Sequence, residues 1–202
     1  MNNQDPNISA YGLLLNDIYH PNPNINKKAY SLIQEDNKAE ILSILILNLS
    51  SDDPGVRRKS IKAISSYGES VLVDISNLFL SSKDRFILTS SLKIFVNVAS
   101  NFPDIKLTQP IILSVNLALD SEFPELNLIA ISFLRQLGYK ALPYLFKLLD
   151  HENILISSAS ITAVSEIKSV YALEKLKEIK DDPEKDCILR SCAENALLNY
   201  SK

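Results

Sequence analysis

The sequence predicts an all-α protein built from repeated pairs of short helices, and three observations support this prediction. A unit that begins with a helix-capping residue recurs along the chain, every copy carries a small residue at the same place, and strand-type alternation is nearly absent. A single elongated repeat array can account for all 202 residues.

The segment 53–64 (DPGVRRKSIKAI) shows the repeating unit most clearly. Asp53 is a strong N-cap because its carboxylate can accept hydrogen bonds from free backbone N–H groups, and Pro54 suits the first helical position. Five further positions start the same pattern: Asn22, Asp84, Phe123, Asn153 and Asp186. Successive starts lie 30 to 39 residues apart, a spacing that is typical of helical repeat arrays.

A small residue follows seven positions after each start: Ala29, Ser60, Ser91, Ala130, Ser160 and Ala193. Three positions further come mostly apolar residues: Leu32, Ala63, Ile94, Phe133, Ala163 and Ala196. A small residue beside a larger apolar one allows another helix to approach closely. We therefore expect both columns to be buried between layers of helices.

The expected architecture is one domain, an α-α superhelix (solenoid) of about five helix pairs with a half-repeat at each end. The repeats are expected at residues 22–52, 53–83, 84–122, 123–152 and 153–185, and the half-repeats at 9–20 and 186–199. Ser9 and Thr108 are expected to cap helices, because their hydroxyls precede apolar helical patterns. Gly68 and Gly138 are expected in the turns between paired helices.

Composition limits the possible functions. The net charge of −3 and the pI near 5.5 give no electrostatic case for nucleic-acid binding. The apolar run 41–49 is too short to span a bilayer, and the N-terminus lacks the features of a signal peptide, so we expect a cytoplasmic protein. Cys187 and Cys192 lie five apart on one expected helix and cannot bridge each other, which predicts free thiols.

Units of about 31 residues with the pattern DPxVRxx(A/S)xxA(I/L) resemble the HEAT-like repeats of the E/F class of phycobilisome bilin lyases. Two segments, 20–23 (HPNP) and 98–104 (VASNFPD), resemble the Z-type members of that class, which serve phycoerythrin. The Arg that this family has four residues after the cap is present only at Arg57 and Arg190.

The resemblance implies a HEAT-like superhelix that binds phycoerythrin subunits and acts as a chaperone-like accessory beside a Y-type lyase subunit. It implies no tightly bound cofactor, and phycoerythrobilin as a transient ligand. Two alternatives are a genuine bilin lyase subunit of a heterodimer and a generic HEAT-repeat scaffold for protein interactions. The resemblance transfers no catalytic residue.

Three arginines are candidates for holding bilin propionates, because a guanidinium group matches a carboxylate: Arg57, Arg58 and Arg190. The alternative for Arg57 is a structural ion pair with the cap carboxylate of Asp53 or Asp84. The corresponding alternative for Arg190 is Asp186.

Three tyrosines near turns could stack on a tetrapyrrole or a partner helix, or could pack at helix ends: Tyr67, Tyr139 and Tyr144. Cys187 at a helix start could add to a bilin, although an incidental cysteine is favoured. His20 and His151 are too isolated for a metal site, and His151 is expected to be solvated.

Overall fold

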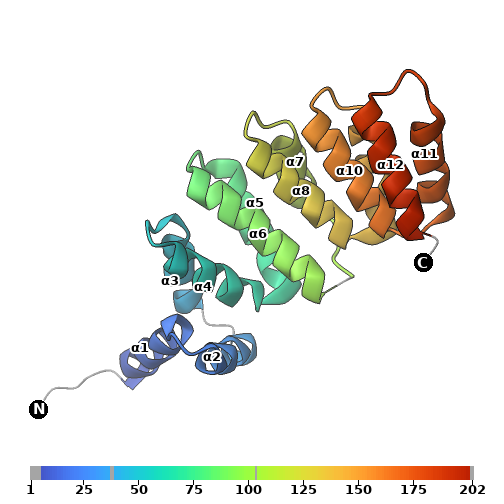
Figure 1. Ribbon diagram of the computed structural model, residues 1–202. Coiled ribbons are helices and arrows are strands. Elements are labelled where there is room, and N and C mark those ends of the chain that lie inside the picture. Colours follow the sequence, from blue (N-terminus) through green and yellow to red (C-terminus); the bar gives the residue numbers. More distant parts are fainter. Residues whose placement is uncertain (1–5, 37–38, 103, 201–202) are drawn as a thin grey trace, which may run out of the picture. The chain divides into compact units, whose positions relative to one another are not determined.

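The computed structural model describes residues 6–36, 39–102 and 104–200, and within these ranges it contains twelve α-helices and no strand (Figure 1). The first helices of the pairs are α2 (Pro23–Asp36), α4 (Pro54–Ser65), α6 (Arg85–Asn101), α8 (Pro124–Gln136) and α10 (Ile154–Glu166). The second helices are α3 (Ala39–Leu47), α5 (Leu72–Ser81), α7 (Gln109–Leu119), α9 (Leu142–Leu148) and α11 (Val170–Asp181). Helix α1 (Pro6–Tyr19) precedes these pairs and α12 (Cys187–Tyr200) follows them. The all-α prediction is confirmed.

The chain divides into two compact units, and the boundary falls within α7. Unit 1 comprises residues 1–102 and 106–114, and unit 2 comprises residues 103–105 and 115–202. In unit 1, α4 packs on α6, and α5 packs on α6 (Figure 1). In unit 2, α10 packs against both α8 and α12, and α11 packs on α12. The expectation of one continuous domain stays a prediction.

Side-chain caps begin the first helices as the sequence predicts. The Oδ1 atom of Asp53 accepts a hydrogen bond from the Gly55 N–H at 2.6 Å, and that of Asp84 accepts from the N–H groups of residues 86 and 87 at 2.7 and 3.1 Å. Equivalent bonds form at three further starts, Asn22, Asn153 and Asp186. Phe123 has no capping side chain, and Pro124 begins α8 there instead.

The column of small residues is buried throughout, which confirms the prediction of close helix packing. Its six members have exposed fractions of 1% or less: Ala29, Ser60, Ser91, Ala130, Ser160 and Ala193. The apolar column beside it is buried too, except for Leu32, which is 48% exposed. That prediction is wrong because α2 packs mainly on α1 and buries only a narrow stripe, which contains Asn26, Ala29 and Ile33.

Two predicted caps are wrong. Helix α1 begins at Pro6, so Ser9 lies inside the helix. Thr108 precedes α7 and its carbonyl oxygen accepts the first intrahelical bond, from Ile112, but its buried hydroxyl has no hydrogen-bond partner among the described residues. The predicted turn glycines are confirmed by positive φ angles, 68° at Gly68 and 62° at Gly138. No described helix is long and apolar enough to cross a membrane.

Candidate functional site

Polar side chains four positions after the cap close the turn that precedes several of the first helices. The Asn26 side-chain amide donates to three carbonyl oxygens within residues 17–20, at 2.9, 2.9 and 2.7 Å. Asn127, its equivalent in the fourth repeat, donates to three carbonyl oxygens at the same offsets within residues 118–121, at 2.8, 2.8 and 3.1 Å. Carbonyls at a helix end lack intrahelical donors, so this position supplies them.

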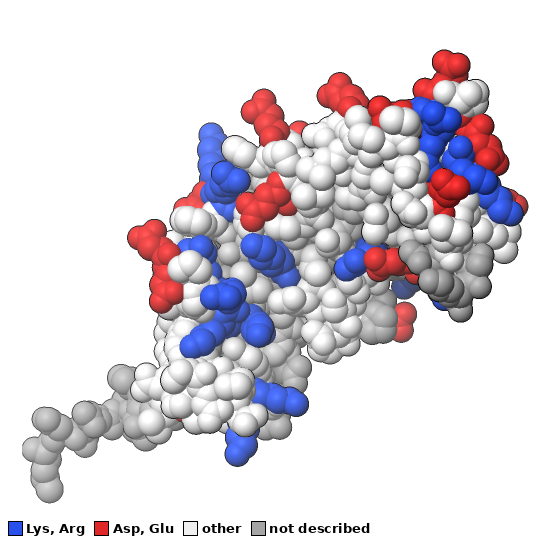
Figure 2. Space-filling view, in the orientation of Figure 1, with Lys and Arg blue, Asp and Glu red and all other residues white. Residues whose placement is uncertain are grey.

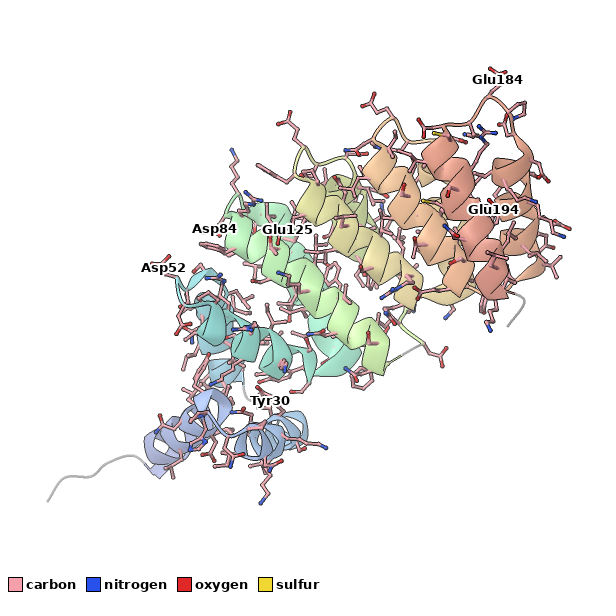
Figure 3. All side chains as sticks on the ribbon, viewed as in Figure 1. Tyr30, Asp52, Asp84, Glu125, Glu184 and Glu194 are labelled. Carbon is pink, nitrogen blue, oxygen red and sulfur yellow. The ribbon has the colours of Figure 1, made fainter. Side chains whose placement is uncertain are left out.

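Arg57 holds the same position in the second repeat and has the same structural role. Its Nη1 atom donates to the carbonyl oxygens of residues 51–52 at 2.5 and 3.1 Å, and its guanidinium carbon lies 4.2 Å from the ring centre of Phe86. The alternative of an ion pair with Asp53 or Asp84 is wrong, because Arg57 forms no ion pair in the described part of the chain. Both carboxylates accept from backbone N–H groups at helix starts, and Figure 3 labels Asp84 at the start of α6. Binding of a ligand carboxylate by Arg57 would therefore compete with these bonds.

The other two candidate arginines have different surroundings. Arg58 is exposed, and its Nε atom donates to the carbonyl oxygen of Pro54 at 3.3 Å. Arg190 is half-buried, and its Nε atom has no hydrogen-bond partner among the residues described. The alternative ion pair of Arg190 with Asp186 is absent from the ion pairs of the described residues. The Asp186 carboxylate accepts from the N–H of Ile188 at 2.7 Å. Their role in ligand binding stays a prediction.

The two histidines hold turns, which sequence reasoning missed. The Nδ1 atom of His20 accepts from the Asn22 N–H at 3.0 Å, and that of His151 accepts from the Asn153 N–H at 3.0 Å. Serine hydroxyls do the same at three other turns, from Ser51, Ser82 and Ser121. The recurrence of His or Ser two residues before a cap is the sequence signal that identifies this role. The expectation of a solvated His151 stays a prediction.

The three candidate tyrosines differ in burial and lie in different units. Tyr67 is half-buried in unit 1, and burial raises the pKa of its phenol to about 12. In unit 2, Tyr139 is 72% exposed, whereas Tyr144 is half-buried. Their stacking on a tetrapyrrole or a partner helix stays a prediction.

Both cysteines are free thiols, as predicted: Cys187 is exposed at the first position of α12, and Cys192 is half-buried. Among the residues whose placement is described, no group of three or more His, Cys, Asp or Glu side chains could hold a metal ion.

An open pocket of about 490 Å³ lies in unit 1 between the first helices α2, α4 and α6. Lys27 and Tyr30 line it from α2, Lys62 from α4 and Asn97 from α6, and Phe102 lines it just beyond α6. Figure 3 labels Tyr30 on α2. Burial raises the pKa of Tyr30, helped by a neighbouring phenol, so its hydroxyl is protonated at neutral pH. Sequence reasoning noted Phe102 only as part of the segment 98–104, and it named none of these residues as a candidate for the site.

A smaller pocket of about 230 Å³ in unit 2 is lined mainly by charged side chains. Lys185 forms an ion pair with Asp150, and Lys175 forms one with Glu178 at 2.7 Å. Both lysines of this pocket are therefore paired with carboxylates of the chain itself, so unit 1 offers the better candidate site.

Comparison with known proteins supports the same architecture. The sequence pattern of HEAT repeats matches residues 114–197. A search of curated proteins gave no significant match. An engineered protein from the Northeast Structural Genomics Consortium matches with 18% identity and a TM-score of 0.50, over 95% of this chain and 96% of that one. The chain has a HEAT-type helical repeat fold.

Two further solved structures are similar. A second engineered protein from the same consortium has 17% identity and a TM-score of 0.51, over 100% of this chain and 56% of that one. Human deoxyhypusine hydroxylase, solved in complex with glycerol, has 17% identity and a TM-score of 0.50, over 96% of this chain and 74% of that one. At these identities the similarity shows the fold alone.

Proposed function

We propose that this protein is a HEAT-type scaffold that binds a protein partner across its second helices. One observation carries the proposal. Two successive second helices of unit 1 each leave two large apolar side chains exposed at spacings that place both on one helix face: Ile44 and Leu47 on α3, and Val73 and Leu80 on α5. Single exposed apolar residues are common, but a regular series of them is typical of a binding surface.

Charge substitution on this surface tests the scaffold proposal. Leu47 and Val73 are 73% and 40% exposed, so Leu47→Glu and Val73→Glu should leave the fold intact. Because a glutamate at a buried contact loses its hydration, each substitution should weaken partner binding at least about tenfold. Leu155→Glu, at a 51% exposed position on the first helix α10, is the matched control and should bind normally.

We further propose that the partner is a phycoerythrin subunit, to which the protein gives chaperone-like help during phycoerythrobilin attachment with a Y-type lyase subunit. The segments 20–23 and 98–104 support this narrower proposal through their resemblance to Z-type proteins. Purified protein is mixed with phycoerythrin subunits and phycoerythrobilin, with and without the Y-type subunit. Complex formation or improved chromophore attachment is expected, and the absence of both effects would leave only the general scaffold proposal.

The alternative of a genuine lyase subunit makes a different prediction, since it requires a group that contacts the bilin. Cys187 and Arg58 are both exposed, so both are accessible to a ligand. Under the lyase alternative, Cys187→Ser or Arg58→Ala abolishes bilin transfer by the heterodimer. Under the chaperone proposal, both variants retain the activity of the unmodified pair.

A further inference from the structure

We propose that the pocket between α2, α4 and α6 binds an acidic segment of a protein partner. This site lies on the first helices of unit 1 and is separate from the second-helix surface described above. The proposal rests on the charge of the pocket and its surroundings, on the ion pairing of its lysines, and on the chemistry of its uncharged side chains.

Two of the three first helices around the pocket, α4 and α6, carry only positive charge. Helices α4 and α6 contain six basic residues and no acidic one: Arg57, Arg58, Lys59, Lys62, Arg85 and Lys93. Figure 2 shows Lys and Arg side chains gathered over this part of unit 1. The corresponding helices of unit 2 (α8, α10 and α12) together contain two basic and three acidic residues. The positive charge is therefore a property of unit 1 in a chain whose net charge is −3.

The two lysines of the pocket are available for a ligand. Lys27 and Lys62 come from neighbouring helices, and no carboxylate lines the pocket among the side chains that the structure describes. Neither lysine forms an ion pair with a carboxylate in that part of the chain. By contrast, Lys59 donates to the carbonyl oxygen of Tyr19 at 2.7 Å. Two unpaired ammonium groups beside one pocket favour an occupant with more than one negative charge.

The uncharged lining suits a peptide better than a small inorganic anion. The Asn101 amide donates to the carbonyl oxygen of Asn97 at 2.8 Å, which leaves its own oxygen free to accept from a peptide N–H. The rings of Tyr30 and Phe102 supply apolar surface, and Phe102 is 37% exposed. A volume of about 490 Å³ accommodates a few side chains. Acidic side chains interspersed with apolar or aromatic ones would match this combination.

Fluorescence polarisation with two labelled peptides tests the proposal on the full chain. One peptide alternates Glu and Tyr, and the other alternates Lys and Tyr. The Glu peptide should bind, and its affinity should fall as salt is raised, because added ions screen exposed charges over about 8–10 Å. The Lys peptide should not bind. Equal binding of both peptides, or no binding of the Glu peptide, would overturn the proposal.

Charge reversal then locates the site. The double variant Lys27→Glu, Lys62→Glu should bind the Glu peptide with an affinity lower by about tenfold or more, because two attractive contacts become repulsive. The matched control reverses two exposed lysines of unit 2, Lys147 and Lys177, and changes the net charge equally. Circular dichroism first checks that both variants are folded. The control variant should then retain most of its affinity for the Glu peptide. An equal loss in both variants would mean that net charge alone drives binding, and would overturn the assignment to this pocket.

The Leu47→Glu variant separates this inference from the scaffold proposal. It should bind the Glu peptide as the unmodified protein does, because Leu47 belongs to α3 and does not line the pocket. Loss of peptide binding in Leu47→Glu would place the peptide on the second helices and refute a separate site. Loss of partner binding with retained peptide binding would support both proposals.

Discussion

The ring of Phe102 lies against the α-carbon of Gly68, so close that an added β-carbon would sit 3.2 Å from the ring Cζ atom. Gly68 has a φ of 68°, a conformation that other residues rarely adopt. One glycine therefore makes the turn between α4 and α5 and also admits the aromatic ring that lines the candidate pocket.

Gly68→Ala should lower the free energy of unfolding by about 1–3 kcal/mol, because it combines a strained φ with a contact to the Phe102 ring. Urea denaturation measures this change. Gly138→Ala is the matched control: its φ is 62°, but nothing lies within 4 Å of the added β-carbon. Gly138→Ala should lower the free energy of unfolding by less than Gly68→Ala does. An equal loss in both variants would show that the Phe102 contact contributes nothing.

Leucine in the column of small residues should disrupt the layers. Ser91 and Ala130 are completely buried, so Ser91→Leu and Ala130→Leu should each lower the free energy of unfolding by about 1–3 kcal/mol through overpacking. Thermal unfolding followed by circular dichroism checks this. Ser91→Ala is the control, since the Ser91 hydroxyl has no hydrogen-bond partner in the described part of the chain and its removal should cost little. If Ser91→Leu is as stable as Ser91→Ala, the position does not lie in a tight contact.

Asn127→Ala should destabilise unit 2 by about 1–3 kcal/mol, because three carbonyl oxygens at the turn after α7 lose their donor. Chemical denaturation of the variant gives the change. Asn116→Ala, at an exposed position on α7, is the control. Its free energy of unfolding should stay within about 0.5 kcal/mol of that of the unmodified protein. Similar values for the two variants would contradict the turn-closing role of Asn127.

Tyr67 should make stability depend on alkaline pH. Burial raises the pKa of its phenol from 10.0 to about 12, so above pH 10 the unfolded chain loses this proton while the folded chain keeps it. The unfolded state then binds fewer protons, and stability falls as pH rises from about 10 to about 12. Below pH 10 the contribution of this phenol is fully present.

Urea denaturation of the protein and of Tyr67→Phe at pH values across this range measures the effect. The phenylalanine variant should lose less stability over the interval, because it has no proton to release there. Identical pH dependence in the two proteins would show that Tyr67 titrates normally in the folded state.

The sequence predicted the helices well because their signals are local. Asp53, Asp84 and Asn153 cap helices through their own neighbouring N–H groups, and the spacing from cap to small residue is fixed by helix geometry. Thr108 failed as a cap although its residue type and position were suitable. Residue type alone did not indicate whether its hydroxyl would reach a donor.

The candidate site was less predictable, since it depends on which side chains from separate helices meet. Sequence reasoning chose Arg57 for its charge, yet the fold brings carbonyl oxygens and the ring of Phe86 to its guanidinium. Lys27 and Lys62 lie 35 positions apart in the chain, and no sequence pattern connects them. Only the packing of α2, α4 and α6 places them beside one pocket.

By itself, the sequence determined that this protein is a stack of short helices with small residues at their contacts, because caps, prolines and helical periodicity act within a few residues of one another. The tertiary structure decided which polar groups close turns and which stay available for a ligand. That outcome depends on contacts between residues distant in sequence, where donors and acceptors from different helices compete for the same partners.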